Sequence, residues 1–179
     1  MVTLTVSDIR KLLQKNDMKP EKLEYRLVEL LNEKHLKVAT AESCTGGLVS
    51  ERITRVSGSS AVFDCGVCSY ANEIKEKLLG VQHDTLSVLG AVSAETAIQM
   101  AEGVKKLSGA DIAVSTTGIA GPTGGTEQKP VGLVFLGVCT DSDAYAVKLL
   151  LGEKNSRDYI RAMASSAALF MAISEAHKK

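Results

Sequence analysis

Apolar residues recur at helical spacing in several stretches of the chain. After Pro20, leucines fall three or four residues apart from Leu23 to Leu31, and a similar apolar run follows Ser93, a residue suited to a helix cap. These patterns predict helices over residues 8–15, 20–34, 45–56, 72–79, 93–107 and 155–176.

Short apolar segments alternate with the helices from Leu36 onward. They predict strands over residues 36–41, 61–70, 111–116, 131–140 and 144–151. The last two are joined only by Asp141-Ser142-Asp143, so they must run antiparallel. Strands separated by helices, followed by a hairpin, predict an α/β fold: a layered α/β/α sandwich with a mixed sheet.

A polar stretch from Lys15 to Lys19 separates the first predicted helix from the rest of the chain. We therefore expect residues 1–18 to form an N-terminal helical appendage and residues 19–179 to form one domain. A chain of 179 residues is long enough to bury a core of its own.

Charge changes the range of expected partners. Lys+Arg and Asp+Glu both number 21, so the net charge is zero, whereas nucleic-acid-binding proteins usually carry a basic surplus or stripe. No apolar run approaches the roughly 20 residues that span a bilayer, and Met1 to Lys15 lacks the continuous apolar segment of a signal peptide. We expect a cytoplasmic protein with no nucleic-acid and no membrane partner, and the sequence leaves a homo-oligomer open.

Four cysteines raise the question of a metal or redox site. Cys65 and Cys68 match C-x-x-C, but they fall inside a predicted strand, where residues three apart point to opposite faces. No second pair supplies further ligands. We expect reduced, buried cysteines and no metal.

The first candidate site is Thr40-Ala41-Glu42-Ser43-Cys44-Thr45-Gly46-Gly47, where a strand runs into a helix through two glycines. Unpaired N–H groups of a first helical turn can hold a phosphate or an oxyanion, and Ser43 would be held rigidly at the strand end. The simpler interpretation is that Ser43 or Thr45 only caps the helix. A thiolate at Cys44 is a rival nucleophile.

The second candidate is Ser69-Tyr70-Ala71-Asn72-Glu73-Ile74-Lys75. A hydroxyl nucleophile needs a base, and a lysine with a lowered pKa can supply it, with the Tyr70 hydroxyl as relay. The alternative is that Lys75 is a surface charge paired with Glu73 or Glu76.

The third candidate is the glycine-rich loop from Gly118 to Pro130, which follows a strand without a phosphate-binding lysine motif. It is typical of a backbone-lined binding loop or a lid, although a plain surface connection stays open. Histidine chemistry is not favoured, because His83, the best placed of three histidines, is expected in a loop.

Four ordered motifs carry a resemblance to a known family. They are Ala41-Glu42-Ser43-Cys44-Thr45-Gly46-Gly47, Tyr70-Ala71-Asn72-Glu73-Ile74-Lys75, Thr117-Gly118-Ile119-Ala120-Gly121-Pro122 and Lys129-Pro130-Val131-Gly132. Together they resemble the C-terminal domain of the competence/damage-inducible CinA family over about residues 20 to 176. The stand-alone form of that family is nicotinamide-nucleotide amidohydrolase.

The resemblance implies an activity and its residues. It implies hydrolysis of nicotinamide mononucleotide, a small-molecule nucleotide, to nicotinic acid mononucleotide and ammonia without a cofactor. It implies Ser43 as nucleophile, Lys75 as base and Tyr70 as third member. It matches Thr117 and Arg157 to positions for substrate binding or catalysis. Together with the backbone of Cys44, Thr45, Gly46 and Gly47 and with Gly118, these are the expected substrate-binding positions. The alternative function is a non-catalytic nucleotide-binding or regulatory module.

Overall fold

The computed structural model describes residues 1–179 and contains one six-stranded sheet. Its strands are β1 (Val2–Thr5), β2 (Val38–Glu42), β3 (Phe63–Cys68), β4 (Ile112–Gly118), β5 (Leu133–Cys139) and β6 (Ala144–Leu150). Its helices are α1 (Val6–Lys15), α2 (Leu23–Lys34), α3 (Leu48–Thr54), α4 (Asn72–Leu79), α5 (His83–Val88), α6 (Ala94–Ser108) and α7 (Arg157–Lys178).

The strands lie in the order β1-β6-β5-β4-β2-β3. β2 pairs in parallel with β3 and β4, whereas β5 runs antiparallel to both β4 and β6. The predicted hairpin and the predicted mixed sheet are therefore confirmed.

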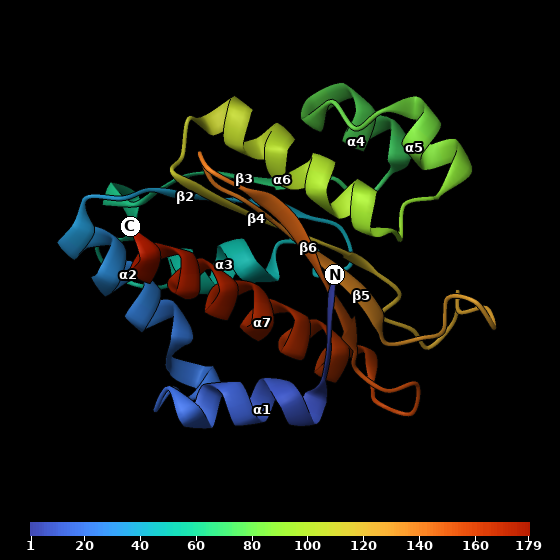
Figure 1. The fold of residues 1–179 in the computed structure, drawn as a ribbon, viewed down its shortest axis with the longest axis horizontal. Coiled ribbons are helices and arrows are strands. Elements are labelled where there is room, and N and C mark those ends of the chain that lie inside the picture. The colour runs from blue at the N-terminus through green and yellow to red at the C-terminus, as the bar shows by residue number, and fades with distance from the viewer.

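Helices cover both faces of the sheet. Figure 1 shows α4, α5 and α6 on one face and α1, α2, α3 and α7 on the other. The larger apolar core, which includes Ile53, Leu136 and Leu169, lies on the α7 face. A smaller core around Ala41, Met100 and Ala113 lies beneath α6. The predicted α/β/α sandwich is confirmed.

A buried polar cluster fixes α3 against its neighbours. The Arg52 guanidinium donates to the Glu24 carboxylate of α2 at 2.6 Å, and to the hydroxyls of Ser165 and Ser166 on α7 at 3.0 and 2.9 Å. Arg52 and Glu24 are both buried, so the pair is held with little screening by solvent. This cluster positions the segment that connects β2 to α3.

The N-terminal residues form a strand that was not predicted, although Val2 to Thr5 alternates apolar and polar residues. β1 pairs in parallel with β6, and Thr5 then caps α1 in a reciprocal capping box with Asp8. Ile9 and Leu13 are buried in the larger core. The division of the chain at residue 18 remains a prediction.

Several element boundaries differ from those predicted. α3 begins at Leu48 instead of Thr45, because Gly46 and Gly47 have φ values of 58° and 91°, outside the right-handed helical region. The predicted loop around His83 is wrong, since α5 begins at that residue. None of the helices is both long and apolar enough to cross a bilayer.

Candidate active site

Three parallel strands end side by side where the connections leave the sheet in opposite directions. α3 connects β2 to β3 on one face, and α4, α5 and α6 connect β3 to β4 on the other (Figure 1). β2 lies between β3 and β4, so its carboxyl end is the point where the winding of the sheet reverses. Open α/β sheets bind ligands at such a point.

Ser43 lies at this point, one residue beyond β2. Its N–H donates to the carbonyl of Thr116 at 2.9 Å, which continues the ladder with β4. Ser43 is 9% exposed, and its hydroxyl forms no hydrogen bond within the protein. The hydroxyl oxygen of Ser43 is accessible to solvent. A reachable hydroxyl on a rigid strand end suits a nucleophile.

The turn after Ser43 presents unpaired backbone donors. The N–H of Gly46 bonds the Ser43 carbonyl at 3.1 Å, whereas the N–H groups of Cys44, Thr45 and Gly47 have no acceptor within the protein. Arg161 of α7 donates to the carbonyl of Thr45 at 2.7 and 3.3 Å and so fixes the turn from below. The open amides lie in this turn and could hold an oxyanion.

The start of α3 is closed to a ligand, contrary to the prediction of open amides in its first turn. The Glu42 carboxylate accepts the N–H groups of Val49 at 3.0 Å and Ser50 at 2.8 Å. It also accepts the hydroxyls of Ser50 at 2.7 Å and Thr45 at 2.6 Å. Glu42 therefore caps the helix, and the alternative that Ser43 or Thr45 caps it is also wrong.

Lys75 is the most unusual side chain of the site. It is 1% exposed, and its Nζ donates to the carbonyls of Ser69 at 2.8 Å and Tyr70 at 3.2 Å. No carboxylate pairs with it, so the predicted alternative of a surface pair with Glu73 or Glu76 is wrong. Burial lowers the pKa of Lys75 below its ordinary 10.5, because the low-dielectric surroundings disfavour the ammonium.

Tyr70 and Arg157 lie at the solvent-facing side of the site. Tyr70 is 65% exposed, and its hydroxyl accepts a long 3.4 Å bond from the Arg157 guanidinium. Arg157 also donates to the carbonyl of Gly121 at 2.9 Å, at the start of the glycine-rich loop. Several of its N–H donors remain open to an anion.

Thr117 and Gly118 form the β4 side of the site. The Thr117 hydroxyl donates to the carbonyl of Ala91 at 2.6 Å and is buried. A Cβ at position 118 would lie 2.6 Å from the carbonyl of Leu133, so the close approach of β5 requires glycine there.

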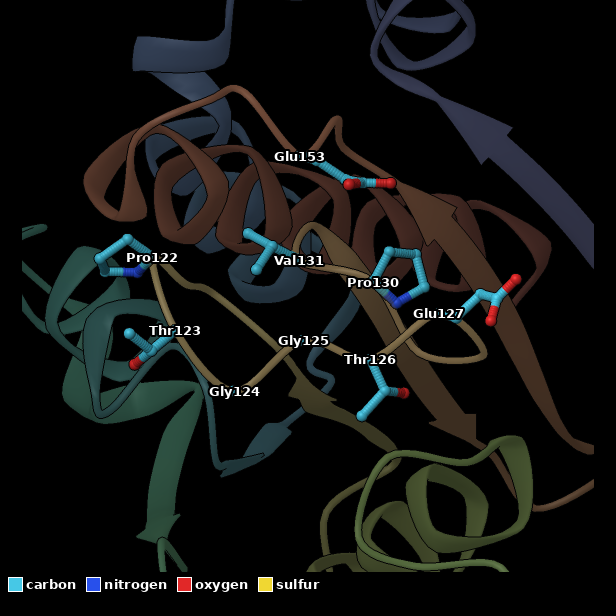
Figure 2. A pocket seen from close by; sticks show the side chains of 9 residues that line it. All are labelled: Pro122, Thr123, Gly124, Gly125, Thr126, Glu127, Pro130, Val131 and Glu153. Carbon is cyan, nitrogen blue, oxygen red and sulfur yellow. The ribbon is translucent and has the colours of Figure 1, made fainter.

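The glycine-rich loop encloses a cavity of its own. The cavity has a volume of about 500 Å³. Figure 2 shows the residues that line it, Pro122 to Glu127, Pro130, Val131 and Glu153. Neither Ser43 nor Lys75 lines it. Its two carboxylates make it a poor site for a phosphate, so we place the reacting centre at the strand ends instead.

The remaining candidates of the sequence lie elsewhere or are unsuited to catalysis. Burial raises the pKa of the Cys44 thiol to about 12, which opposes its action as a nucleophile. Cys68 is exposed and Cys65 is only half-buried, so the expectation of buried cysteines fails for these two, although all four cysteines are free. His83 is exposed and pairs with Glu76 at 3.0 Å.

Sequence reasoning missed three residues of the site: Glu42, Ser69 and Arg161. A glutamate inside a short apolar strand was a readable signal, because a buried carboxylate needs donors nearby. Arg161 lies four residues after Arg157, hence on the same helical face. Ser69 gave no such signal.

The sequence matches the CinA C-terminal domain family over residues 20–176. The chain belongs to this family. The CinA domain is 53% identical over 149 residues to a CinA-like protein of Kosmotoga olearia, an alignment that covers 83% of this chain and 36% of that protein. The chain spans about a third of the length of the curated relatives it matches.

Solved structures of CinA proteins share the fold. The competence/damage inducible protein CihA from Agrobacterium tumefaciens superposes with a TM-score of 0.84 at 43% identity, covering 87% of this chain and 94% of that one. The competence damage-inducible protein A (ComA) from Klebsiella pneumoniae gives 0.83 at 29% identity, covering 88% and 96%.

Proposed function

We propose that this CinA domain hydrolyses the carboxamide of nicotinamide mononucleotide, giving nicotinic acid mononucleotide and ammonia. Ser43 is the nucleophile and Lys75 its base. The observation that carries the proposal is the environment of Lys75. This lysine is 1% exposed and has no carboxylate partner. Its side chain extends from α4 to the strand ends, where Ser43 lies. Ionisable groups with shifted pKa values and no structural partner cluster at functional sites.

The hydrogen bonds of Lys75 suit a neutral amine. A neutral amine has two N–H groups and one lone pair, and Nζ has two carbonyl acceptors, those of Ser69 and Tyr70. The lone pair is then free to take a proton from a hydroxyl. The lowered pKa of Lys75, caused by its burial, shifts the equilibrium toward this neutral state.

The reaction proceeds in two halves. Ser43 Oγ attacks the carboxamide carbon as its proton passes to Lys75, and the open amides of Cys44, Thr45 and Gly47 stabilise the oxyanion. The ammonium of Lys75 returns the proton to the leaving nitrogen, so ammonia departs and an ester on Ser43 remains. Water, activated by the same base, then hydrolyses the ester. These steps use side chains and backbone only and need no metal or organic cofactor.

Two groups near the opening of the site suit the rest of the substrate. Arg157 has donors that can bind the phosphate in a bidentate manner. The exposed ring of Tyr70 beside it can contact the pyridine ring. The role of Arg157 agrees with the resemblance noted from the sequence, whereas the resemblance implied Tyr70 as a catalytic member and not as a substrate contact.

Ammonia release from the mononucleotide tests the proposal. The wild-type protein should release ammonia, and Ser43→Ala should lose about 10³-fold or more in kcat, as removal of a nucleophile does. Ser87→Ala, which changes an exposed serine on α5, is the matched control and should keep full activity.

Calorimetry with the same ligand separates catalysis from binding alone. Wild-type protein that binds the mononucleotide without releasing ammonia would favour a nucleotide-binding module over the amidohydrolase. Full activity in Ser43→Ala would remove Ser43 from the mechanism.

A further inference from the structure

Ser69 carries the one buried side-chain polar atom of the chain that has no hydrogen-bond partner. The residue is 0% exposed, so bulk water does not satisfy its hydroxyl. Ser115, equally buried in β4, shows the usual arrangement: its hydroxyl donates to the carbonyl of Ala97 and accepts from the N–H of Gly137. A buried hydroxyl without a partner costs stability, so its presence calls for an explanation.

The strand register places Ser69 beside Ser43. β2 and β3 pair Ala41 with Val67 and Glu42 with Cys68, and the N–H of Ser69 donates to the carbonyl of Glu42 at 2.8 Å. Ser43 and Ser69 are therefore the next pair. By strand alternation their side chains share the face of Ala41 and Val67, which lies beneath α6. Directly opposed side chains in a sheet are neighbours.

The backbone of Ser69 also holds the base. Its carbonyl accepts from Lys75 Nζ at 2.8 Å, so the amine lies next to the residue that bears the unpartnered hydroxyl. Ser69 is therefore the neighbour of Ser43 by strand register and of Lys75 through its own carbonyl. A serine hydroxyl can donate one hydrogen bond and accept another, and it rotates among three staggered positions.

We propose that the Ser69 hydroxyl carries the proton between Ser43 and Lys75, as a further catalytic residue of this site. The inference rests on the proposed amidohydrolase function. In the first half-reaction the Ser43 proton passes to Ser69 Oγ while the proton of Ser69 passes to Lys75 Nζ, leaving Ser69 neutral and Lys75 an ammonium. When ammonia departs, the ammonium gives its proton to Ser69 and the Ser69 proton goes to the leaving nitrogen, so both residues end unchanged.

Tyr70 is less suited to this relay in the free protein. Its ring is 65% exposed, and its hydroxyl bonds the Arg157 guanidinium instead of Lys75. Tyr70 bonds Lys75 Nζ through its backbone carbonyl and not through its hydroxyl. The structure thus assigns the relay to Ser69 and leaves Tyr70 to bind substrate.

Ser69→Ala tests the proposal, with Ser69→Thr as the variant that retains a hydroxyl. We expect Ser69→Ala to lower kcat for ammonia release about 10²-fold, as loss of an acid–base group does, while KM changes by less than about threefold. Ser69→Thr should recover at least about 10-fold of that loss. Ser69→Ala should melt no lower than wild type, since it removes an unsatisfied hydroxyl, whereas Ser115→Ala should melt lower.

A substrate-independent readout separates this proposal from the proposed function. Phenylmethanesulfonyl fluoride sulfonylates an activated serine, with fluoride as the leaving group, and peptide mass spectrometry gives its rate at Ser43. Ser69→Ala should slow that rate about 10²-fold. Equal sulfonylation of wild type and Ser69→Ala, or a kcat within about threefold of wild type, would overturn the relay. A wild-type protein that is sulfonylated at Ser43 but releases no ammonia would instead refute the substrate.

Discussion

Lys75 Nζ lies 2.8 Å from the carbonyl oxygen of Ser69, and Ser69 is the β3 neighbour of Ser43. A side chain that begins on α4 thus reaches the end of the sheet. The Lys75 side chain donates its hydrogen bonds to carbonyl oxygens. Unlike a carboxylate, a carbonyl carries no charge that would neutralise an ammonium. The parallel pairing of β2 with β3 thus connects the proposed base to the proposed nucleophile.

Lys75→Met should stabilise the protein at neutral pH, because burying a lysine without a counter-ion costs free energy whether the group stays charged or loses its proton on folding. The pKa of Lys75 is lower in the folded chain than its ordinary 10.5, so between these two values the unfolded chain holds more protons. The stability of the wild type therefore rises with pH in that window. The advantage of the variant should shrink as the pH approaches 10.5.

Urea unfolding of the two proteins over this pH range checks the prediction. Lys77→Met, at an exposed position on the same helix, is the control and should behave as wild type. A wild type that loses stability relative to Lys75→Met as the pH rises would contradict the account.

Glu42→Leu should destabilise the protein by at least about 3 kcal/mol, because four donors to this buried carboxylate lose their acceptor. Glu51→Gln changes an exposed carboxylate of α3 and should shift stability by less than about 1 kcal/mol. Denaturant unfolding measures both. A mild effect of Glu42→Leu would show that the cap does not hold the turn that carries Ser43.

Arg161→Gln should reduce kcat about 10-fold to 100-fold, since a small displacement of a reacting group has effects of this size. The side chain fixes the Thr45 carbonyl and with it the turn of open amides. Arg10→Gln is a matched control, because that guanidinium bonds only the Tyr159 hydroxyl, away from the turn. Steady-state kinetics decide, and unchanged kcat in Arg161→Gln would refute this positioning role.

Iodoacetamide should modify Cys68 and spare Cys44 at about pH 8, because alkylation requires the thiolate. Cys68 is exposed, whereas burial raises the pKa of Cys44 to about 12. Peptide mass spectrometry locates the label, and ammonia release should not fall. Preferential labelling of Cys44 with parallel loss of activity would restore it as the rival nucleophile.

Local patterns were enough to predict most of the fold. Ser93 caps α6 and α4 spans Asn72–Leu79, both as predicted, and the short connection after Cys139 dictated the hairpin. β1 was missed although Val2 to Thr5 alternates apolar and polar residues, because the run is only four residues long and largely exposed. Its pairing with β6 is a long-range contact that no local signal reveals.

The site was only partly predictable. The glycines after Ser43 and the order of the motifs pointed to the strand ends. The burial of Lys75 was not predictable, since its neighbours Glu73 and Glu76 suggested an exposed helix. Ser69 became visible only through the strand register, because an unpaired hydroxyl is a property of packing and not of sequence.

The most direct test of the central claim is the pH dependence of kcat/KM for ammonia release from nicotinamide mononucleotide, compared for wild type and Lys75→Met. Methionine is preferred to arginine because a guanidinium would carry a permanent charge into a site 1% exposed. We predict a wild-type rate that rises through a pKa below 10.5, and a loss of about 10²-fold or more with no such rise in Lys75→Met. A Lys75→Met protein with near wild-type turnover and the same pH profile would contradict the Ser-Lys mechanism.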